Sequence, residues 1–302
     1  MKRKQRIVLG ILNAFRGNLS RKVMQKLVFL YCERSEDRIF NFVPFKYGCY
    51  SLELADMQLD LYRSGCLTQE KDNWKISKKG EKEALNLDLF ELEHISTLER
   101  RFSSMPENEL IRYVYLAYPF YATQSVILDK ILTPEEQKSI FILKKKVENA
   151  KLNKSIVSIG YEGYSIDSYI EILVKNNVRV LCDVRKNPIS RKPGFSKTSF
   201  AQVLENVNIK YYHFPQLGIP SNLRKELNNQ EDYDSLFNFY EKNILQHNLQ
   251  YVEEISSLLD NFGTTAILCF ERDPKQCHRT RVIKRLLEFR ENDVKVITSK
   301  CL

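Results

Sequence analysis

The sequence predicts an α/β protein, with a Rossmann-like, mostly parallel sheet flanked by helices in the C-terminal half and a mainly helical domain before it. From residue 155 onward, short β-branched apolar runs alternate with helical stretches, which is the order of a parallel sheet wrapped by helices. Before residue 150, apolar residues recur mainly at helical spacing. A length of 302 residues with 43% hydrophobic residues is enough for one large domain or two ordinary ones.

Residues 1–92 show the order helix, turn, helix, strand. Ser20 is a suitable N-cap for a first helix, and Ser51 for a second one that stops at Gly65. Residues 73–82 then predict a short strand and a lysine-rich turn. This order is typical of a winged helix, which would present lysines to DNA from its wing: Lys75, Lys78, Lys79 and Lys82. The alternative is a small helical packing domain whose lysines only keep it soluble.

Residues 93–150 predict a helical connector. Pro106 and Pro134 stand where helices should begin, and Thr133 is a suitable cap before Pro134. The polar stretch "KKKVENAKLNK" follows as a linker. The predicted division is therefore 1–92, 93–150 and 151–302.

The strands of the C-terminal domain are expected in the runs "SIVSIGYEG", "VRVLCDVR", "KYYHFP", "TTAILCFE" and "VKVIT". In open α/β sheets, ligands bind outside the carboxyl ends of the strands, so the residues after each run are the site candidates. These residues are unusually polar: Tyr161, Glu162, Asp183, Arg185, His213, Cys269, Glu271 and Arg272. The stretch "GYEG" lacks the third glycine of a dinucleotide fingerprint, and there is no Walker loop, so we expect no cofactor.

The stretch "DVRKNPISRKPGFSK" predicts a basic loop stiffened by prolines. Arg185 and Arg191 could hold phosphate or carboxylate, because guanidinium forks bind such groups bidentately. The alternative is a solvated surface loop. Asp183 and Arg185 alternate out of an apolar strand, so we expect at least one of them at the rim of the sheet.

The stretch "CFERDPKQCHRTRVIKRLL" predicts a helix with Asp273 as N-cap and Pro274 as its first residue, which places Cys277 and His278 in or near the first turn. Arg279 shares a face with apolar residues and should lean toward the sheet, where it needs a ligand anion or an internal carboxylate such as Glu271 or Asp183.

Three interpretations stay open for the cysteines of this stretch. Cys277 near a helix N-terminus could be a nucleophilic thiolate, or it could only pack. A disulfide with Cys269 is disfavoured in a reducing compartment. Zinc would need Cys269, Cys277 and His278 together, which requires the loop to fold back, so we expect no metal. Glu271 or Glu162 could serve as a general acid or base, or simply pair with an arginine.

Residues 155 to about 300 resemble the DUF488 family (domain of unknown function 488). The family pattern "TIGxS", "DVRxxPxSRxxxFSK", "YxHxPxLGG" and "CxExxPxxCHR" is similar to "SIGYEGYSIDSY", "DVRKNPISRKPGFSK", "YYHFPQLGIP" and "CFERDPKQCHR" here. Two positions depart from it: Ile219 replaces a glycine, and "GYEG" replaces a His-Ser. The resemblance implies no activity. It points to these residues: Asp183, Arg185, Ser190, Arg191, Phe195, Ser196, Tyr212, Leu217, Gly218, Cys269, Glu271, Cys277, His278 and Arg279.

The stretch "FKYGCYSLELADMQLDLYRSGCL" is similar to the "FGPYS…L…L…GLI" pattern of Panacea-type, antitoxin-associated domains. The net charge of +9 is compatible with a polyanionic partner. The seven cysteines, without a close Cys-x-x-Cys pair, are mostly expected to be reduced core residues, and no apolar run is long enough for a membrane helix. We therefore expect a cytoplasmic protein, with homo-oligomerisation left open.

The functional hypothesis is an enzyme, a hydrolase or transferase acting on nucleic acid or nucleotide, tethered to a DNA-binding domain. A ligand-sensing DNA-binding regulator, or a toxin–antitoxin or phage-defence component without turnover, is the alternative, and a protein-binding scaffold is a third interpretation. The expected catalytic residues are Glu271, Cys277 and Asp183. The expected substrate-binding residues are Arg185, Arg191, Ser196, Tyr212, His278, Arg279, Tyr161 and Glu162.

Overall fold

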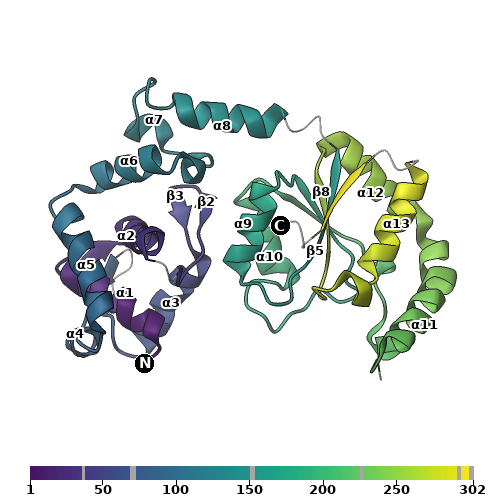
Figure 1. Ribbon diagram of the computed structural model, residues 1–302, viewed down its shortest axis with the longest axis horizontal. Helices are drawn as coiled ribbons and strands as arrows, with labels where there is room; N and C mark the ends of the chain where they lie inside the picture. The colour runs from purple at the N-terminus through teal and green to yellow at the C-terminus, as the bar shows by residue number, and fades with distance from the viewer. Residues whose placement is uncertain (36–37, 69–72, 150–153, 225–226, 291–293, 299–302) are drawn as a thin grey trace. The chain divides into compact units, whose positions relative to one another are not determined.

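The computed structural model describes residues 1–35, 38–68, 73–149, 154–224, 227–290 and 294–298. The chain divides into two compact units, Met1–Lys144 and Lys145–Leu302 (Figure 1). None of the described helices combines the length and apolar character that crossing a bilayer requires.

The N-terminal unit is built around three helices: α1 (Arg3–Ala14), α2 (Arg21–Arg34) and α3 (Leu52–Arg63). The predicted N-caps are confirmed, since Ser20 Oγ accepts the Val23 N–H and Ser51 Oγ accepts the Leu54 N–H, each at 3.2 Å. Helix α3 ends just before Gly65, whose φ of 74° lies in the left-handed region that glycine adopts without strain.

Two short antiparallel pairs accompany these helices. β1 (Asn18–Ser20) pairs with β4 (Asn73–Lys75), and β2 (Val43–Phe45) pairs with β3 (Gly48–Tyr50). The prediction of a lysine-rich turn after β4 is wrong, because residues Lys78–Ala84 form helix α4. Ser77 caps that helix by accepting the Gly80 N–H at 3.1 Å, and Gly80 and Ala84 are buried against the unit. The predicted DNA-binding lysines thus lie on different elements, Lys75 on β4 and Lys78, Lys79 and Lys82 on α4.

Helices α5 (Leu89–Phe102) and α6 (Glu107–Ala117) lie in the region expected to be a connector. Their buried residues Ile95, Leu98 and Val114 belong to the same core as α1 and α2. A 3-10 turn, η1 (Pro119–Ala122), and helices α7 (Leu128–Ile131) and α8 (Lys138–Asn149) follow. Residues 134–137 form turns before α8, so the helix begins later than Pro134 predicts.

The C-terminal unit contains a five-stranded, wholly parallel sheet in the order β7-β6-β8-β5-β9. The predicted runs form its strands: β5 (Ser155–Gly160), β6 (Val180–Asp183), β7 (Lys210–His213), β8 (Thr265–Cys269) and β9 (Lys295–Thr298). β8 lies between β5 and β6, its partners on either side. The predicted Rossmann-like parallel sheet is therefore confirmed.

Helices cover both faces of this sheet (Figure 1). One face carries α11 (Gln230–Tyr240), α12 (Leu249–Phe262) and α13 (Arg279–Phe289), whose apolar residues pack with Ile156, Val180 and Ile267 of the strands. The other carries α9 (Ile166–Lys175) and α10 (Lys197–Glu205). Helix α10, at the end of the basic loop, was not predicted from the sequence.

Helix α13 begins later than the sequence predicts. Asp273 does cap, but its carboxylate accepts the Lys275 N–H at 2.9 Å to start only a 3-10 turn, η7 (Pro274–Gln276). Cys277 is extended, at φ −130° and ψ 131°, and α13 starts at Arg279 with His278 as N-cap. The α-helix start predicted at Pro274 is therefore wrong, while Cys277 and His278 lie directly before the first turn of α13, near a helix start as expected. The extended residue carries the Cys277 side chain into the interior instead.

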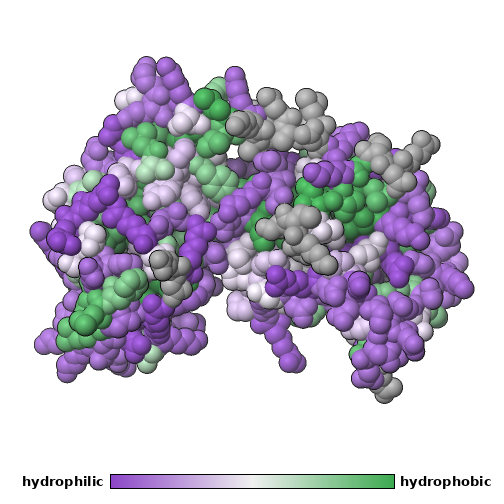
Figure 2. Space-filling view, viewed as in Figure 1, coloured by the Kyte–Doolittle hydropathy of each residue, from purple (hydrophilic) through white to green (hydrophobic). Residues whose placement is uncertain are grey.

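Figure 2 shows hydrophobic side chains gathered on the surface of the N-terminal unit over α4 and the start of α5. Leu85, Leu89 and Phe90 are exposed in this region. The cysteines of the described residues are buried and free, as expected for core thiols, and Cys301 lies outside the described residues.

Candidate functional site

The candidate site lies at the carboxyl ends of the parallel strands. β5, β6, β7 and β8 end at Gly160, Asp183, His213 and Cys269, and parallel strands bring these ends to one edge of the sheet. Most of the residues expected after the strands therefore share that edge. They form two separate polar clusters, one around Asp183 and one around Cys269.

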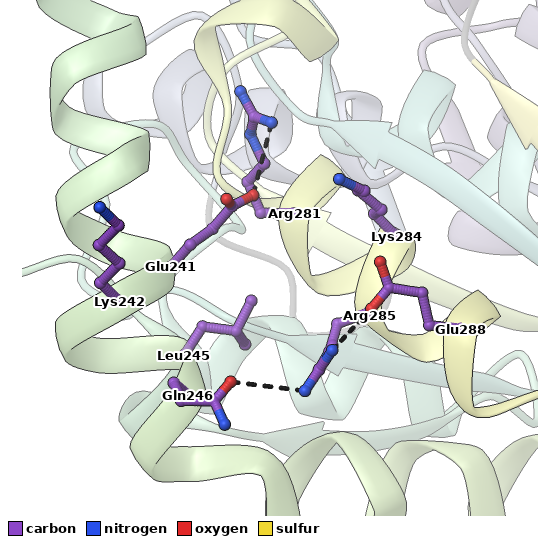
Figure 3. Close-up of a pocket in the computed structure, with 8 residues that line it drawn as sticks. All are labelled: Glu241, Lys242, Leu245, Gln246, Arg281, Lys284, Arg285 and Glu288. Atoms are coloured by element: carbon purple, nitrogen blue, oxygen red, sulfur yellow. Dashed lines mark hydrogen bonds and ion pairs between the residues drawn. The ribbon is translucent and has the colours of Figure 1, made fainter.

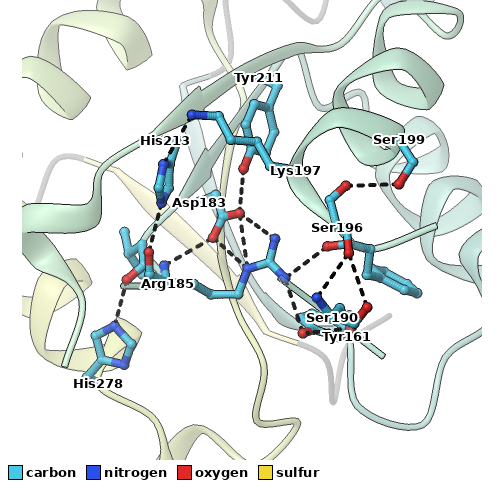
Figure 4. Close-up of polar contacts among 12 residues, drawn as sticks. Tyr161, Asp183, Arg185, Ser190, Ser196, Lys197, Ser199, Tyr211, His213 and His278 are labelled. Atoms are coloured by element: carbon cyan, nitrogen blue, oxygen red, sulfur yellow. Dashed lines mark hydrogen bonds and ion pairs between the residues drawn. The ribbon is translucent and has the colours of Figure 1, made fainter. Parts of the chain in front are cut away.

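The first cluster is centred on a buried ion pair between Asp183 and Arg185. Arg185 Nε donates to Asp183 Oδ1 at 2.8 Å and Nη2 donates to Oδ2 at 2.5 Å (Figure 4). Asp183 is fully buried and Arg185 is 6% exposed. Burial lowers the pKa of Arg185, but the hydrogen bonds and charge of Asp183 outweigh it and raise the pKa. Both side chains face the rim of the sheet, which agrees with the alternation along the strand. However, they bind each other there, so the carboxylate and the guanidinium form an internal ion pair.

The remaining donors of Arg185 hold the basic loop in place. Nη1 donates to the Tyr161 hydroxyl at 3.1 Å and to the Phe195 carbonyl at 3.0 Å. The rings of Tyr161 and Phe195 stack at 4.4 Å. Ser196 Oγ accepts the Ser190 N–H at 3.0 Å and closes the loop on itself (Figure 4). Tyr161, Arg185 and Ser196 thus shape the loop through internal bonds.

Two side chains of β7 complete this cluster. Tyr211, which was not among the predicted site residues, donates its hydroxyl to Asp183 Oδ2 at 2.6 Å. His213 Nε2 lies 2.9 Å from the Arg185 carbonyl. Tyr212 packs instead with the core on the α11–α13 face, because neighbouring strand residues point to opposite faces. The predicted site residue Tyr212 is therefore separated from the Asp183 cluster.

The second cluster contains Cys269, Glu271, Cys277 and His278, whose donor atoms all lie within 4.8 Å of one another. Cys269 Sγ lies 2.9 Å from Glu271 Oε2 and 3.5 Å from His278 Nδ1. Cys269 and Glu271 come from the end of β8, and Cys277 and His278 return to them after the η7 turn. The loop does fold back, which the sequence alone left open.

Arg224 is a member of this cluster that the sequence did not indicate. It lies on the 3-10 turn η4 (Ser221–Arg224), pairs with Glu271 Oε1 through Nη1, and places Nη2 2.9 Å from His278 Nδ1. No local pattern could reveal it, because it is 47 residues from Glu271 in the chain. The side chains of Arg224 and Glu271 are 29% and 14% exposed, whereas Cys269, Cys277 and His278 are buried. The cluster is thus reached from the Arg224–Glu271 side.

The thiols of this cluster differ in their electrostatics. Burial raises the pKa of Cys269, but the hydrogen bond from Cys277 and the positive charge of Arg224 outweigh it and hold the pKa well below the usual cysteine range. Burial and the neighbouring Cys269 raise the pKa of Cys277 well above that range. The low-pKa thiol considered at Cys277 is therefore found at Cys269. Burial also raises the pKa of Glu271, helped by the charge of Cys269.

Arg279 leans into the sheet, as its apolar face predicts, and is fully buried. It does not meet the carboxylate of Glu271 or Asp183. Its Nε donates to Ser158 Oγ at 3.1 Å, Nη2 donates to the Arg272 carbonyl at 3.1 Å, and Nη1 donates to the Glu271 carbonyl. Arg279 therefore holds the backbone of the loop that carries Glu271.

Other expected site residues lie apart from both clusters. Arg191 is exposed on the basic loop. Glu162 accepts the Arg272 N–H at 3.0 Å and so ties the loop after β5 to the loop after β8. Arg185, Arg191 and Arg279 consequently do not surround a common anion pocket.

A groove of about 360 Å³ lies between α13 and the π-helical turn η5 (Glu241–Leu245), away from both clusters (Figure 3). Its arginines pair with neighbouring acids, Arg281 with Glu241 at 3.4 Å and Arg285 with Glu288 at 2.7 Å. It contains none of the expected site residues.

Residues 165–286 match the family described as "Domain of unknown function DUF488". The matched range contains Asp183, Arg185 and the whole Cys269 cluster, and it begins after Tyr161 and Glu162. The comparisons with curated proteins and with solved structures gave no match. The C-terminal half of the chain therefore carries a DUF488 domain.

Proposed function

We propose that the DUF488 domain is a hydrolase or transferase that acts on a nucleotide or nucleic acid, with its reaction centre at the Cys269 cluster. The observation that carries this proposal is the convergence of Glu271, Arg224 and His278 at the carboxyl edge of the sheet, where α/β enzymes place their chemistry.

Glu271 is the group proposed to transfer protons. Its carboxylate is mostly buried yet lies on the accessible side of the cluster, and a carboxylate in such a place is a suitable general acid or base. Arg224 is proposed to bind the anionic part of the substrate. It takes the role first expected of Arg185 and Arg279, whose donors are occupied inside the domain.

The proposed substrate class rests on charge. The chain carries a net charge of +9, the loop that follows β6 exposes Lys186 and Arg191, and the first residue of α10, Lys197, is exposed as well. Clustered lysines and arginines attract phosphates and gain entropy when counterions are released. A phosphate-bearing substrate therefore suits this edge of the sheet better than a neutral one.

The N-terminal unit is proposed to bind DNA. Lys75, Lys78, Lys79 and Lys82 are exposed on β4 and α4 of this unit. Replacing Lys78, Lys79 and Lys82 by alanine should weaken duplex binding and reduce the slope of log K against log salt by about 0.9 for each phosphate that the variant no longer neutralises. An unchanged slope would contradict this part of the proposal.

The enzymatic part is tested with the full-length protein on a panel of nucleotides and of single-stranded and duplex oligonucleotides, with products followed by mass spectrometry. We expect Glu271→Gln to lower kcat by about 10²-fold to 10⁴-fold, because the variant has no proton-transfer group at this position. Arg224→Met should mainly raise KM. Glu253→Gln, which changes an exposed acid on α12, is the matched control and should turn over as the wild type does. Equal turnover by all three variants would remove Glu271 and Arg224 from the reaction.

A further inference from the structure

We propose that Cys269, Cys277 and His278 form a binding site for one zinc ion, with its fourth coordination position facing Glu271. This inference goes beyond the proposed function, and it stands or falls on metal binding alone.

The histidine is already oriented as a metal ligand. A guanidinium has no acceptor, so Arg224 Nη2, at 2.9 Å, must donate to a lone pair on His278 Nδ1. The ring proton is then on Nε2, which donates to the Val184 carbonyl at 3.0 Å. Metal-binding histidines usually donate their second N–H to a carbonyl or carboxylate in this way. Tyr240 fixes the ring further by an edge contact at 5.5 Å.

The spacing of the donors suits a tetrahedral zinc ion. Typical zinc–sulfur and zinc–nitrogen bonds of about 2.3 Å and 2.0–2.1 Å give a tetrahedral edge of about 3.6 Å between sulfur and nitrogen. Cys269 Sγ and His278 Nδ1 are 3.5 Å apart. Cys277 Sγ lies within 4.8 Å of the other donor atoms, as a free thiol. Only small side-chain adjustments would bring all three atoms onto one ion.

Arg224 already places a positive charge against the proposed site. Its guanidinium contacts Glu271 and the Nδ1 lone pair that zinc would use. Because the Arg224 side chain is 29% exposed, it can release His278 and still lie beside Glu271. Arginine and zinc should therefore compete for the same lone pair, which gives the proposal a sharp test.

The donor set selects the class of metal. Two thiolates and one imidazole are soft and borderline ligands that favour zinc over magnesium or calcium, which prefer oxygen. Both cysteines would bind as thiolates, and any proton that a sulfur still carries would be released to solvent. The ion supplies the positive charge that then balances the buried sulfurs.

The experiment titrates the reduced, full-length protein with zinc against a chromogenic chelator, and then with cobalt to record the thiolate-to-metal absorption. We expect one ion per chain, with an absorption of two thiolates per cobalt. Cys277→Ala should halve that absorption and weaken zinc binding by more than about 100-fold, beyond the range seen when a residue that only supports a ligand is changed. Cys182→Ala, another fully buried cysteine of the sheet, should bind as the wild type does.

Arg224→Met provides a second test that does not depend on the folding of a core variant. Removing the competing guanidinium should tighten zinc binding by about 10-fold, which corresponds to the free energy of one charged hydrogen bond. Weaker binding by this variant, or wild-type affinity no better than that of Cys277→Ala, would overturn the proposal. So would a Cys269–Cys277 disulfide in the isolated protein combined with no zinc uptake after reduction. Turnover plays no part in these measurements, so zinc binding without activity would refute only the proposed function.

Discussion

Asp183 and Arg185, two residues apart at the end of β6, form a bidentate ion pair: both oxygens of the buried carboxylate accept from the guanidinium. The pair therefore works as a structural clamp between the sheet and the loop that follows it, since Arg185 also reaches Phe195 across that loop. Removing this ion pair should lower the free energy of unfolding of the C-terminal unit.

Arg185→Met should destabilise the C-terminal unit by about 3–5 kcal/mol, because it leaves the Asp183 charge buried without its partner. Urea unfolding followed by circular dichroism would measure the loss. Trp74 is the single tryptophan of the chain and is buried in the N-terminal unit, so its fluorescence should show that unit unchanged. Arg191→Met, on an exposed side chain, is the control and should cost less than about 0.5 kcal/mol. A cost below about 1 kcal/mol for Arg185→Met would contradict the clamp.

Tyr211→Phe should cost about 1–3 kcal/mol, since the hydroxyl bond to the Asp183 carboxylate is a charged hydrogen bond in a half-buried place. Tyr212→Phe, on the opposite face of the same strand, is the matched control and should have a smaller effect. The same urea experiment compares the two. Equal losses for both tyrosines would mean that the Asp183 contact adds nothing to stability.

Gly160→Ala should disturb the Cys269 cluster. A Cβ at this position would lie 1.9 Å from the Glu271 carbonyl oxygen, which is backbone and cannot swing away. The loop carrying Glu271 must shift, at a cost of about 1–3 kcal/mol or more. Thermal unfolding measures that cost, and reactivity of Cys269 toward iodoacetamide reports whether the cluster has opened. A variant with wild-type stability and wild-type reactivity would show that the close approach does not constrain the loop.

Lys26 predicts a pH dependence for the N-terminal unit. Its ammonium group is buried against the Cys49 carbonyl at 3.2 Å, and burial lowers its pKa. In the unfolded chain the lysine pKa is about 10.4. At pH values between the lowered pKa of the folded protein and about 10.4, the unfolded chain therefore binds more protons at Lys26 than the folded protein does. The free energy of unfolding from this residue should rise as pH increases from the lowered pKa toward about 10.4.

Trp74 fluorescence in urea at several pH values measures this rise, as the difference between the wild type and Lys26→Met. Lys82→Met, on an exposed lysine of α4, serves as the control and should follow the wild type. Parallel pH profiles for the wild type and Lys26→Met would show that Lys26 titrates normally.

The architecture was predictable because the relevant patterns are local. Apolar runs of β-branched residues in alternation with helical faces define the parallel sheet, and Ser20 and Ser51 cap helices through bonds to residues three positions ahead. Helix α10 escaped prediction because its apolar residues follow a proline- and glycine-rich loop and its N-cap Ser196 makes no side-chain capping bond.

The site was less predictable because its bonds are long-range. Asp273 and Pro274 have the residue types of a helix start, yet burial of Cys277 and His278 ends the turn after three residues. Arg224 meets Glu271 from a segment far away in the sequence, and the apolar face of Arg279 does not reveal that its partners are backbone carbonyls. Sequence patterns located the edge of the sheet, and tertiary packing decided which side chains meet there.

The sheet order has a consequence for synthesis of the chain. β5 and β6 follow each other in sequence but are held apart by β8, which is translated much later. A nascent chain that stops before residue 265 lacks β8, so the edges of β5 and β6 that pair with β8 would have no partner. Exposed strand edges tend to pair with other chains. Truncated products should therefore aggregate rather than persist as a partial domain, and Cys269 and its neighbours come together only as the sheet closes.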